Sequence, residues 1–155
     1  MTMNNQFFMP LKMIVIKNIS TTETYDIRLE VLRKGIPLPV QFNGDDESET
    51  IHLGAFKSGK LIAISSFMKA SNKNFRGKQY QLRGMATLPE FQGLGAGKLM
   101  MLASFKIFKD LKVDCLWCNA RIIAVDFYKK LGLKTLGEEF ELKYIGNHYV
   151  MYKYF

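Results

Sequence analysis

The sequence predicts an α/β (α+β) protein with a mixed sheet and helices on both of its faces. Seven short runs rich in β-branched and aromatic residues have the length and composition of strands. Three longer segments carry the 3.6-residue apolar period of helices. The helices fall among the strands in the order β-α-β-β-β-α-β-α-β-β, and this alternation favours a layered sheet.

The N-terminal third supplies the first strand and the first helix. Residues 1–10 are expected to be a loose lead-in, and residues 12–17 contain the apolar core of a strand. Residues 21–34 fit a helix that starts in a Ser/Thr cluster and ends at Gly35. Residues 43–49 are predicted to be an exposed acidic loop. Its acids are Asp45, Asp46, Glu47 and Glu49.

The middle of the chain is predicted to be a hairpin and a central strand. Residues 51–56 and 61–68 are strand-like runs joined by a short turn that contains Gly59. Residues 79–87 follow as a third strand of this group. Pro89 ends that strand because proline has no backbone N–H to donate.

The C-terminal half alternates strands and helices. Residues 94–111 predict a largely buried helix, since apolar side chains cover much of its circumference. Residues 113–118 follow as a buried strand. Residues 121–131 fit another helix with Gly132 as its C-terminal cap. The last two strands are expected at residues 133–137 and 144–154.

Composition and charge limit the class of protein. The 155 residues suit one domain over 1–155, and 48% hydrophobic residues exclude a disordered chain. The absence of a long apolar run and of a signal peptide indicates a cytoplasmic protein with no membrane partner. A net charge of +8 suits a polyanion, either nucleic acid or a phosphate-bearing cofactor. No run of five or six like charges is present, which makes nucleic acid the weaker alternative.

Cys115 and Cys118 are predicted to be reduced and buried. A structural zinc site would need a second pair of ligands, and the sequence has only these two cysteines, so no metal site is expected. A redox pair would stand at a helix start. Residues three apart on a strand face opposite sides of the sheet, which does not suit either role.

The most informative segment lies between the strand at 79–87 and the long helix. Gly93, Gly95 and Gly97 alternate there. Glycines let the backbone approach an anion closely, and the start of a helix offers unpaired N–H groups, so the loop suits a pyrophosphate. The segment does not match a Walker A loop or the dinucleotide fingerprint G-x-G-x-x-G.

What remains is Gln-x-x-Gly-x-Gly, filled by Gln92, Gly95 and Gly97. This segment resembles the acyl-CoA-binding motif of the GNAT N-acetyltransferase superfamily, Gln/Arg-x-x-Gly-x-Gly/Ala. The run Asn119-Ala120-Arg121, the Phe127-Tyr128 pair and the late His148 are similar to the ElaA/YjcF-like branch of small bacterial members. Most members of the superfamily have Asn at the position of Arg121, and whether Arg121 replaces its contact is left open.

The resemblance implies a mostly antiparallel sheet of about seven strands. The strands at 79–87 and 113–118 would splay apart to admit acetyl-CoA. Main-chain groups of Met85, Ala86 and Thr87 would pair with its pantetheine arm. The remaining cofactor-binding positions are Gln92, Gly93, Leu94, Gly95, Ala96, Gly97, Lys98, Asn119 and Phe127.

The implied reaction is transfer of an acetyl group from acetyl-CoA to a primary amine by direct attack in a ternary complex. Tyr128 is the candidate general acid, and a structural aromatic is its alternative. His148 is the candidate base, with Glu139 and Glu141 as rivals and a structural histidine as the alternative.

The resemblance leaves several points about ligands and partners open. The amine could be a small molecule or part of a peptide, and the acidic loop could guide a cationic amine. A homodimer is compatible with the family. A non-catalytic acyl-CoA-binding domain and a basic nucleic-acid-binding protein are the competing functions.

Overall fold

A computed structural model describes residues 13–155, which form one seven-stranded sheet in the order β1-β2-β3-β4-β5-β7-β6. Neighbouring strands are antiparallel except β4 and β5, which run parallel. The mixed, mostly antiparallel sheet expected from the sequence is therefore confirmed. The strands are β1 Ile14–Asn18, β2 Ile51–Lys57, β3 Lys60–Lys69, β4 Gln79–Thr87, β5 Cys115–Arg121, β6 Lys134–Leu142 and β7 Gly146–Tyr154.

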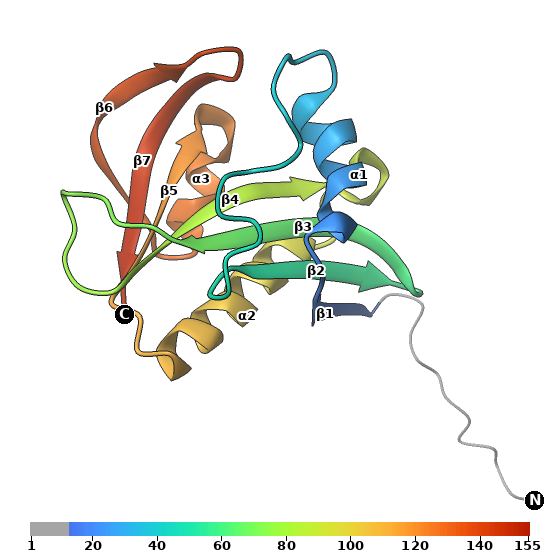
Figure 1. The fold of residues 1–155 in the computed structure, drawn as a ribbon, viewed down its shortest axis with the longest axis horizontal. Coiled ribbons are helices and arrows are strands. Elements are labelled where there is room, and N and C mark those ends of the chain that lie inside the picture. Colours follow the sequence, from blue (N-terminus) through green and yellow to red (C-terminus); the bar gives the residue numbers. More distant parts are fainter. Residues whose placement is uncertain (1–12) are drawn as a thin grey trace, which may run out of the picture.

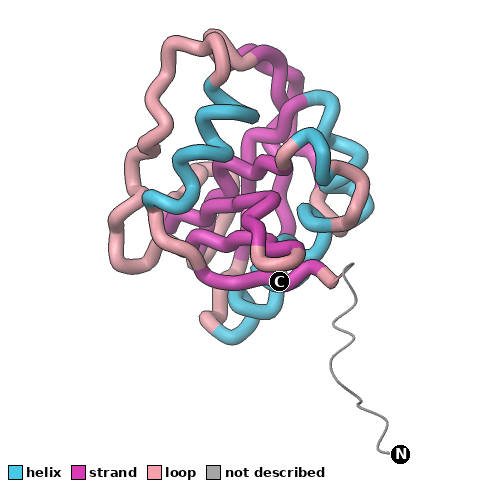
Figure 2. The backbone as a smooth tube through the Cα atoms, turned by 90° about the vertical axis from the view of Figure 1, so that its right-hand side faces the viewer, coloured by secondary structure: helices cyan, strands magenta, loops and turns pink. Residues whose placement is uncertain are grey.

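Helices cover both faces of the sheet, as Figures 1 and 2 show. On one face α2 (Ala96–Asp110) crosses β1 to β4. The opposite face carries a helical segment that packs on β3 and β4. It consists of η1 (Thr22–Thr24), α1 (Tyr25–Ile27) and η2 (Arg28–Arg33). The last helical segment, η4 (Ile122–Ala124) with α3 (Val125–Lys130), contributes to the core beneath α2.

The alternation of side chains along β3 divides the core into two parts. Ala63 and Phe67 point to the α2 side, where the ring of Phe67 meets Phe108 edge to face at 5.3 Å between centroids. Ile64 and Met68 point to the other side, beneath α1 and η2. Each large apolar side chain buried in this way contributes about 1.5–3 kcal/mol. The central strands are therefore held from both faces.

Two predicted turns are confirmed by backbone geometry. Ser58 and Gly59 join β2 to β3 with φ values of 49° and 77°, as a tight hairpin requires. Gly132 follows α3 with φ 91°, which is the left-handed conformation of a helix C-terminus.

The helices differ from the expectation in three respects. The helix expected over residues 21–34 is present but changes from 3-10 through α to π geometry along its length. The long helix begins at Ala96, because Gly95 has φ 87° and cannot continue a right-handed helix. It is also buried on one side only, since Leu99 and Leu102 are exposed. Among the described helices, none has the length and apolar character to span a bilayer.

Two strands of the C-terminal half continue well past their predicted ends. β5 continues to Arg121, so this residue ends a strand instead of starting a helix. β6 continues to Leu142, although Gly137 reads as a strand end in the sequence. Gly137 has φ 75°, and the register with β7 shifts between Leu136 and Phe140. The glycine thus makes a bulge within the strand rather than ending it.

Candidate active site

The loop between β4 and α2 combines a short 3-10 turn, η3 (Pro89–Phe91), with two glycines in the left-handed region. Gly93 has φ 78° and Gly95, the N-cap of α2, has φ 87°. No atom lies within 4 Å of the place where a Cβ would stand on either residue. These glycines are therefore required by the backbone conformation and not by lack of space.

The main-chain N–H groups of this loop are free to bind a ligand. From Gly93 to Lys98, none donates a hydrogen bond to another residue within 13–155, and Gly95 provides no side-chain cap. The loop surface from Gln92 to Gly95 is exposed, as is Lys98. Unpaired N–H groups at the positive end of a 15-residue helix have the chemistry to hold an anion.

Gly97 brings together three elements that the sequence assigns to the cofactor site. A Cβ on Gly97 would lie 3.2 Å from Cζ of Phe127 and 3.9 Å from Sδ of Met85. The first distance is tighter than most Cβ contacts, so a side chain here would press on the Phe127 ring and the ring would have to move by a few tenths of an ångström. Met85 from β4, Gly97 from α2 and Phe127 from α3 thus share one corner of the molecule.

β4 and β5 separate halfway along their length. Their parallel pairing runs from Gln79 opposite Cys115 to Leu82 opposite Cys118. Beyond that point β4 continues beside β3, and β5 continues beside β7. In the described part of the chain, no strand pairs with the β5-facing edge of residues 83–87. This confirms the splayed strand pair that the resemblance implied.

Tyr128 is the buried residue of α3 and belongs to the core on the α2 side of the sheet. Its side chain is 6% exposed, and its hydroxyl makes no hydrogen bond to another residue of the described range. Burial raises the pKa of the phenol, the nearby Cys118 raises it further, and Arg121 opposes the shift. The phenol therefore remains a neutral hydrogen-bond donor at physiological pH.

His148 lies on β7 and is 3% exposed. Its Nδ1 stands 2.6 Å from the carbonyl oxygen of Gly146, so Nδ1 carries a proton and donates to that oxygen. In the neutral ring, Nε2 is then the free acceptor. His148 is directly opposite Arg121 in the β5–β7 register, so the two side chains share a sheet face.

The predicted site residues divide between the two faces of the sheet. Tyr128 and Phe127 belong to the core on the α2 side, together with Met85. Asn119 and His148 alternate with residues of that core and therefore point to the opposite face. The structure thus separates Asn119 from the corner formed by Met85, Gly97 and Phe127.

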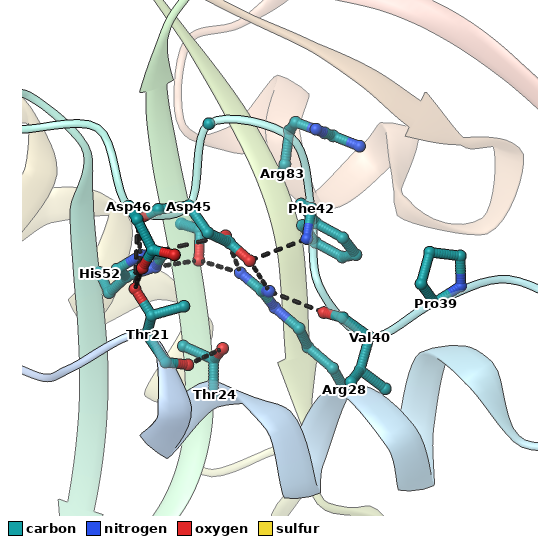
Figure 3. A network of polar contacts seen from close by, with 12 residues as sticks. Thr21, Thr24, Arg28, Pro39, Val40, Phe42, Asp45, Asp46, His52 and Arg83 are labelled. Atoms are coloured by element: carbon teal, nitrogen blue, oxygen red, sulfur yellow. Dashed lines mark hydrogen bonds and ion pairs between the residues drawn. The ribbon is translucent and has the colours of Figure 1, made fainter.

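The acidic loop predicted at residues 43–49 is not uniformly exposed, and this expectation is wrong for Asp45. Asp45 is 5% exposed and accepts two hydrogen bonds from the fully buried Arg28, at 2.7 and 2.9 Å. It also accepts from the backbone N–H of Phe42. Figure 3 shows this network between η2 and the loop. Asp45 therefore neutralises a buried cation and is not available to guide a cationic amine.

Sequence reasoning did not identify a group of arginines on the same side of the sheet. The guanidinium groups of Arg28, Arg83 and Arg33 lie 3.8, 4.7 and 5.0 Å from the centroid of the Phe42 ring. These residues come from η2 and β4, which are distant in sequence. No local spacing signals their meeting, because the loop that carries Phe42 brings them together.

The two cysteines are free and buried, as predicted. Cys118 belongs to the core on the α2 side, and Cys115 belongs to a separate cluster with Trp117. Burial raises the pKa of Cys115 to about 11 and that of Cys118 to about 12. Both thiols are therefore protonated at neutral pH and are not activated nucleophiles.

Comparison with known proteins agrees with this geometry. Residues 18–133 match the model of the acetyltransferase (GNAT) family. The uncharacterized N-acetyltransferase YitI of Bacillus subtilis is 38% identical over 143 residues, which cover 91% of this chain and 96% of YitI. The chain belongs to the GNAT acetyltransferase family. The superfamily resemblance stated from the sequence is confirmed.

Solved structures share the GNAT fold. Escherichia coli ElaA superposes with a TM-score of 0.74 at 15% identity, over 91% of this chain and 99% of ElaA. PaiA N-acetyltransferase of Thermoplasma acidophilum, solved in complex with coenzyme A, gives a TM-score of 0.68 at 19% identity, over 92% and 99%. At these identities the likeness shows the fold, and acyltransferase activity follows from the family match and the YitI relative.

Proposed function

We propose that this GNAT protein transfers an acetyl group from acetyl-CoA to a primary amine by direct attack within a ternary complex. The observation that supports this most strongly is the run of unpaired N–H groups from Gly93 to Lys98, beside the gap between β4 and β5. Every helix start leaves its first N–H groups without an intrahelical partner, and here no side-chain cap satisfies them, so they remain open to a ligand.

The residues present fit a ligand with a diphosphate and an amide-bearing arm. The N–H groups of the loop and the Lys98 ammonium would hold the diphosphate. Main-chain groups of Met85, Ala86 and Thr87 would pair with the arm along the free edge of β4. Phe127 would lie beside that arm, and Asn119 would reach it through the opening. When bound, acetyl-CoA supplies the acyl group as an activated thioester.

The chain's own groups would then assist attack by the amine. The gap between β4 and β5 holds the amine near the thioester, so proximity supplies much of the acceleration. The N–H of Met85 would donate to the oxygen on which negative charge develops. Tyr128 would donate a hydrogen bond to the departing sulfur. Its raised pKa keeps the phenol protonated while that bond forms.

The amine must lose a proton before it attacks, since the pKa of a primary ammonium is about 10. His148 is our candidate base, because its Nδ1–H bond to Gly146 leaves Nε2 as an acceptor. Glu139 is exposed on β6, as is Glu141. Solvated carboxylates are weak bases, so both are poorer candidates than His148.

Calorimetric titration with acetyl-CoA, followed by a thiol-release assay over a panel of amines, tests the proposal. We expect saturable binding and amine-dependent release of free thiol. Binding without release for any amine would indicate a non-catalytic acyl-CoA-binding domain. Failure to bind acetyl-CoA would exclude the proposed function. Salt-sensitive binding of a DNA duplex in its place would identify a nucleic-acid-binding protein.

A further inference from the structure

Three guanidinium groups surround one aromatic ring on the sheet face opposite α2. Phe42 is 8% exposed, and its ring lies within 5.0 Å of Arg28, Arg33 and Arg83. Figure 3 shows Phe42 between the helix that carries Arg28 and the strand that carries Arg83. Contact with the ring face offsets part of the repulsion between these cations. It does not neutralise them.

The charges of this arginine cluster are only partly balanced. Asp45 binds Arg28 through both carboxylate oxygens, while Arg33 and Arg83 form no ion pair within residues 13–155. Their hydrogen bonds go to main-chain oxygens instead. Arg33 donates to the carbonyl oxygens of Pro39 and Leu32, and Arg83 donates to that of Asn43 at 3.4 Å.

A fourth arginine, Arg121, lies opposite the candidate base His148 in the register between β5 and β7. Burial lowers the pKa of Arg33, and the positive charges of Arg83, Arg121 and Arg28 lower it further. The charge of Arg121 also opposes the rise in the pKa of Tyr128. Arg121 lies on the same sheet face as the arginine cluster, because it alternates along β5 with Ala120, which belongs to the core on the α2 side. It forms no ion pair in the described part of the chain.

The cluster stands at the opening between the central strands. Arg83 is the first residue of β4 after the last β4–β5 pair, and Arg121 is the last residue of β5. Both side chains are half-buried, as is that of Arg33. Their charges are therefore partly shielded from bulk water but remain accessible to a ligand. Partial burial strengthens the attraction between a guanidinium and an incoming anion.

We infer that the amine acceptor carries an anionic group, a carboxylate or a phosphate, which the guanidinium groups of Arg33, Arg83 and Arg121 bind on the sheet face opposite α2. This inference rests on the proposed function. A guanidinium presents its donors in a planar fork that matches both kinds of anion. Arg28 is already engaged by Asp45 and so would contribute charge rather than a binding fork. Polyamines and other purely cationic acceptors would be repelled.

Matched pairs of amines test the inference. An α-amino acid is compared with its amide, and an amino-sugar phosphate with the unphosphorylated amino sugar. Each compound is titrated calorimetrically into the protein and assayed for thiol release with acetyl-CoA at constant ionic strength. We expect at least one anionic member to bind and react at least about tenfold better than its uncharged partner, as charge-assisted hydrogen bonds predict.

Variants assign the effect to the cluster. Arg83→Met and Arg121→Met should each raise KM for the preferred anionic amine about tenfold or more, with little change in kcat or in KM for its uncharged partner. Arg83→Lys should retain part of the preference. Arg76→Met is the matched control, since Arg76 is exposed in the loop that precedes the other end of β4.

The outcomes separate this inference from the proposed function. Equal or better binding and turnover of the uncharged members would overturn the anionic acceptor and leave the acetyltransferase proposal intact. Absence of binding by every anionic member at about 10 mM, a concentration at which even weak specific sites fill, would also overturn it. Acetyl-CoA that neither binds nor reacts would exclude the proposed function, whereas the calorimetric preference for anions would still be measurable.

Discussion

Tyr128 is buried in a core of apolar side chains, yet its hydroxyl forms no hydrogen bond to any residue described in the structure. Arg28 Nε is the one buried side-chain polar atom without a partner in residues 13–155, so the Tyr128 hydroxyl is not sealed off and reaches accessible space from a buried ring. Burial raises the pKa of this phenol. A neutral donor that waits for an acceptor is well suited to a departing thiolate, which develops negative charge only during the reaction.

Replacing Tyr128 by phenylalanine tests this role. Tyr128→Phe removes the hydroxyl and keeps the ring. We expect kcat to fall by about 10- to 1000-fold, a loss comparable to the contribution of a general acid. Acetyl-CoA affinity and thermal stability should change little. Steady-state kinetics measures kcat, titration calorimetry measures the affinity for acetyl-CoA, and thermal denaturation measures the stability. Phe127→Leu is the comparison variant, and it should weaken acetyl-CoA binding. An unchanged kcat in Tyr128→Phe would remove this residue from the mechanism.

At the scale of elements, the two glycines at the junction between β4 and α2 have different roles: one sets the backbone conformation and the other leaves space beside the helix. Gly95 adopts φ 87° and so sets where α2 begins. Gly97 has ordinary helical geometry, but its missing side chain lets Phe127 lie against the first turn. These two glycines are required for different physical reasons, and a substitution at each should therefore fail in a different way.

Gly97→Ala should weaken acetyl-CoA binding without unfolding the protein. The new Cβ would press on the Phe127 ring, while alanine favours the helix over glycine by up to about 1 kcal/mol. We expect a loss of affinity of about tenfold, or 1.4 kcal/mol, and an unchanged or slightly higher thermal midpoint. Calorimetric titration and thermal denaturation measure the two effects. Lys106→Ala, exposed on the same helix, is the control. Equal affinities for Gly97→Ala and Lys106→Ala would refute the crowding argument.

The same elements show what could be predicted from the sequence. The hairpin at Gly59, the glycine loop and the C-terminal cap at Gly132 depend on local backbone conformation, which residue type constrains directly. Asp45 was misjudged because its burial depends on Arg28, which is 17 positions away in the chain. Arg121 was placed in a helix because nothing in its neighbours shows that β7 extends β5. Contacts between distant segments leave no periodic signal.

At the scale of the whole molecule, a buried polar network fastens the segment after η2 to the sheet. Arg28 donates to Asp45, Ser66 and the carbonyl oxygen of Val40. The Nδ1 of His52 lies 2.7 Å from Oγ of Ser66, and its Nε2 lies 2.9 Å from the carbonyl oxygen of Asp45. Within the described residues, the Arg28 Nε is the one buried side-chain polar atom without a partner. The network thus links η2 and the acidic loop to β2 and β3.

Asp45→Asn should destabilise the fold strongly. It leaves Arg28 as a buried cation without its counter-charge, so we expect a loss of about 3–5 kcal/mol in the free energy of unfolding at pH 7. Urea denaturation measures this loss. Glu47→Gln, a charge change at an exposed position of the same loop, should stay within about 0.5 kcal/mol. Similar losses in both variants would contradict a specific ion pair.

The pH dependence of this loss follows from the pKa of Asp45. Burial alone would raise that pKa, but hydrogen bonds from Arg28 and Phe42 outweigh it and hold it below its ordinary value. The stabilisation is therefore complete above pH about 4, near the carboxyl pKa of the unfolded chain. It is lost as pH falls through the lower pKa of the folded state. The difference between wild type and Asp45→Asn should begin to narrow as pH falls below about 4, and it should be smallest below the lowered pKa of folded Asp45, where wild-type Asp45 is also protonated.

The break between β4 and β5 also affects how the protein moves. Pairing between the β1–β4 half and the β5–β7 half of the sheet is limited to the register from Gln79 to Leu82. A pantetheine arm bound along residues 83–87 would extend this short pairing and connect the two halves of the sheet. The amides along this edge should then exchange with deuterium quickly in the empty protein and slowly with coenzyme A present. Bound coenzyme A would act like an additional strand, and the sheet would be more rigid in the complex than in the free protein.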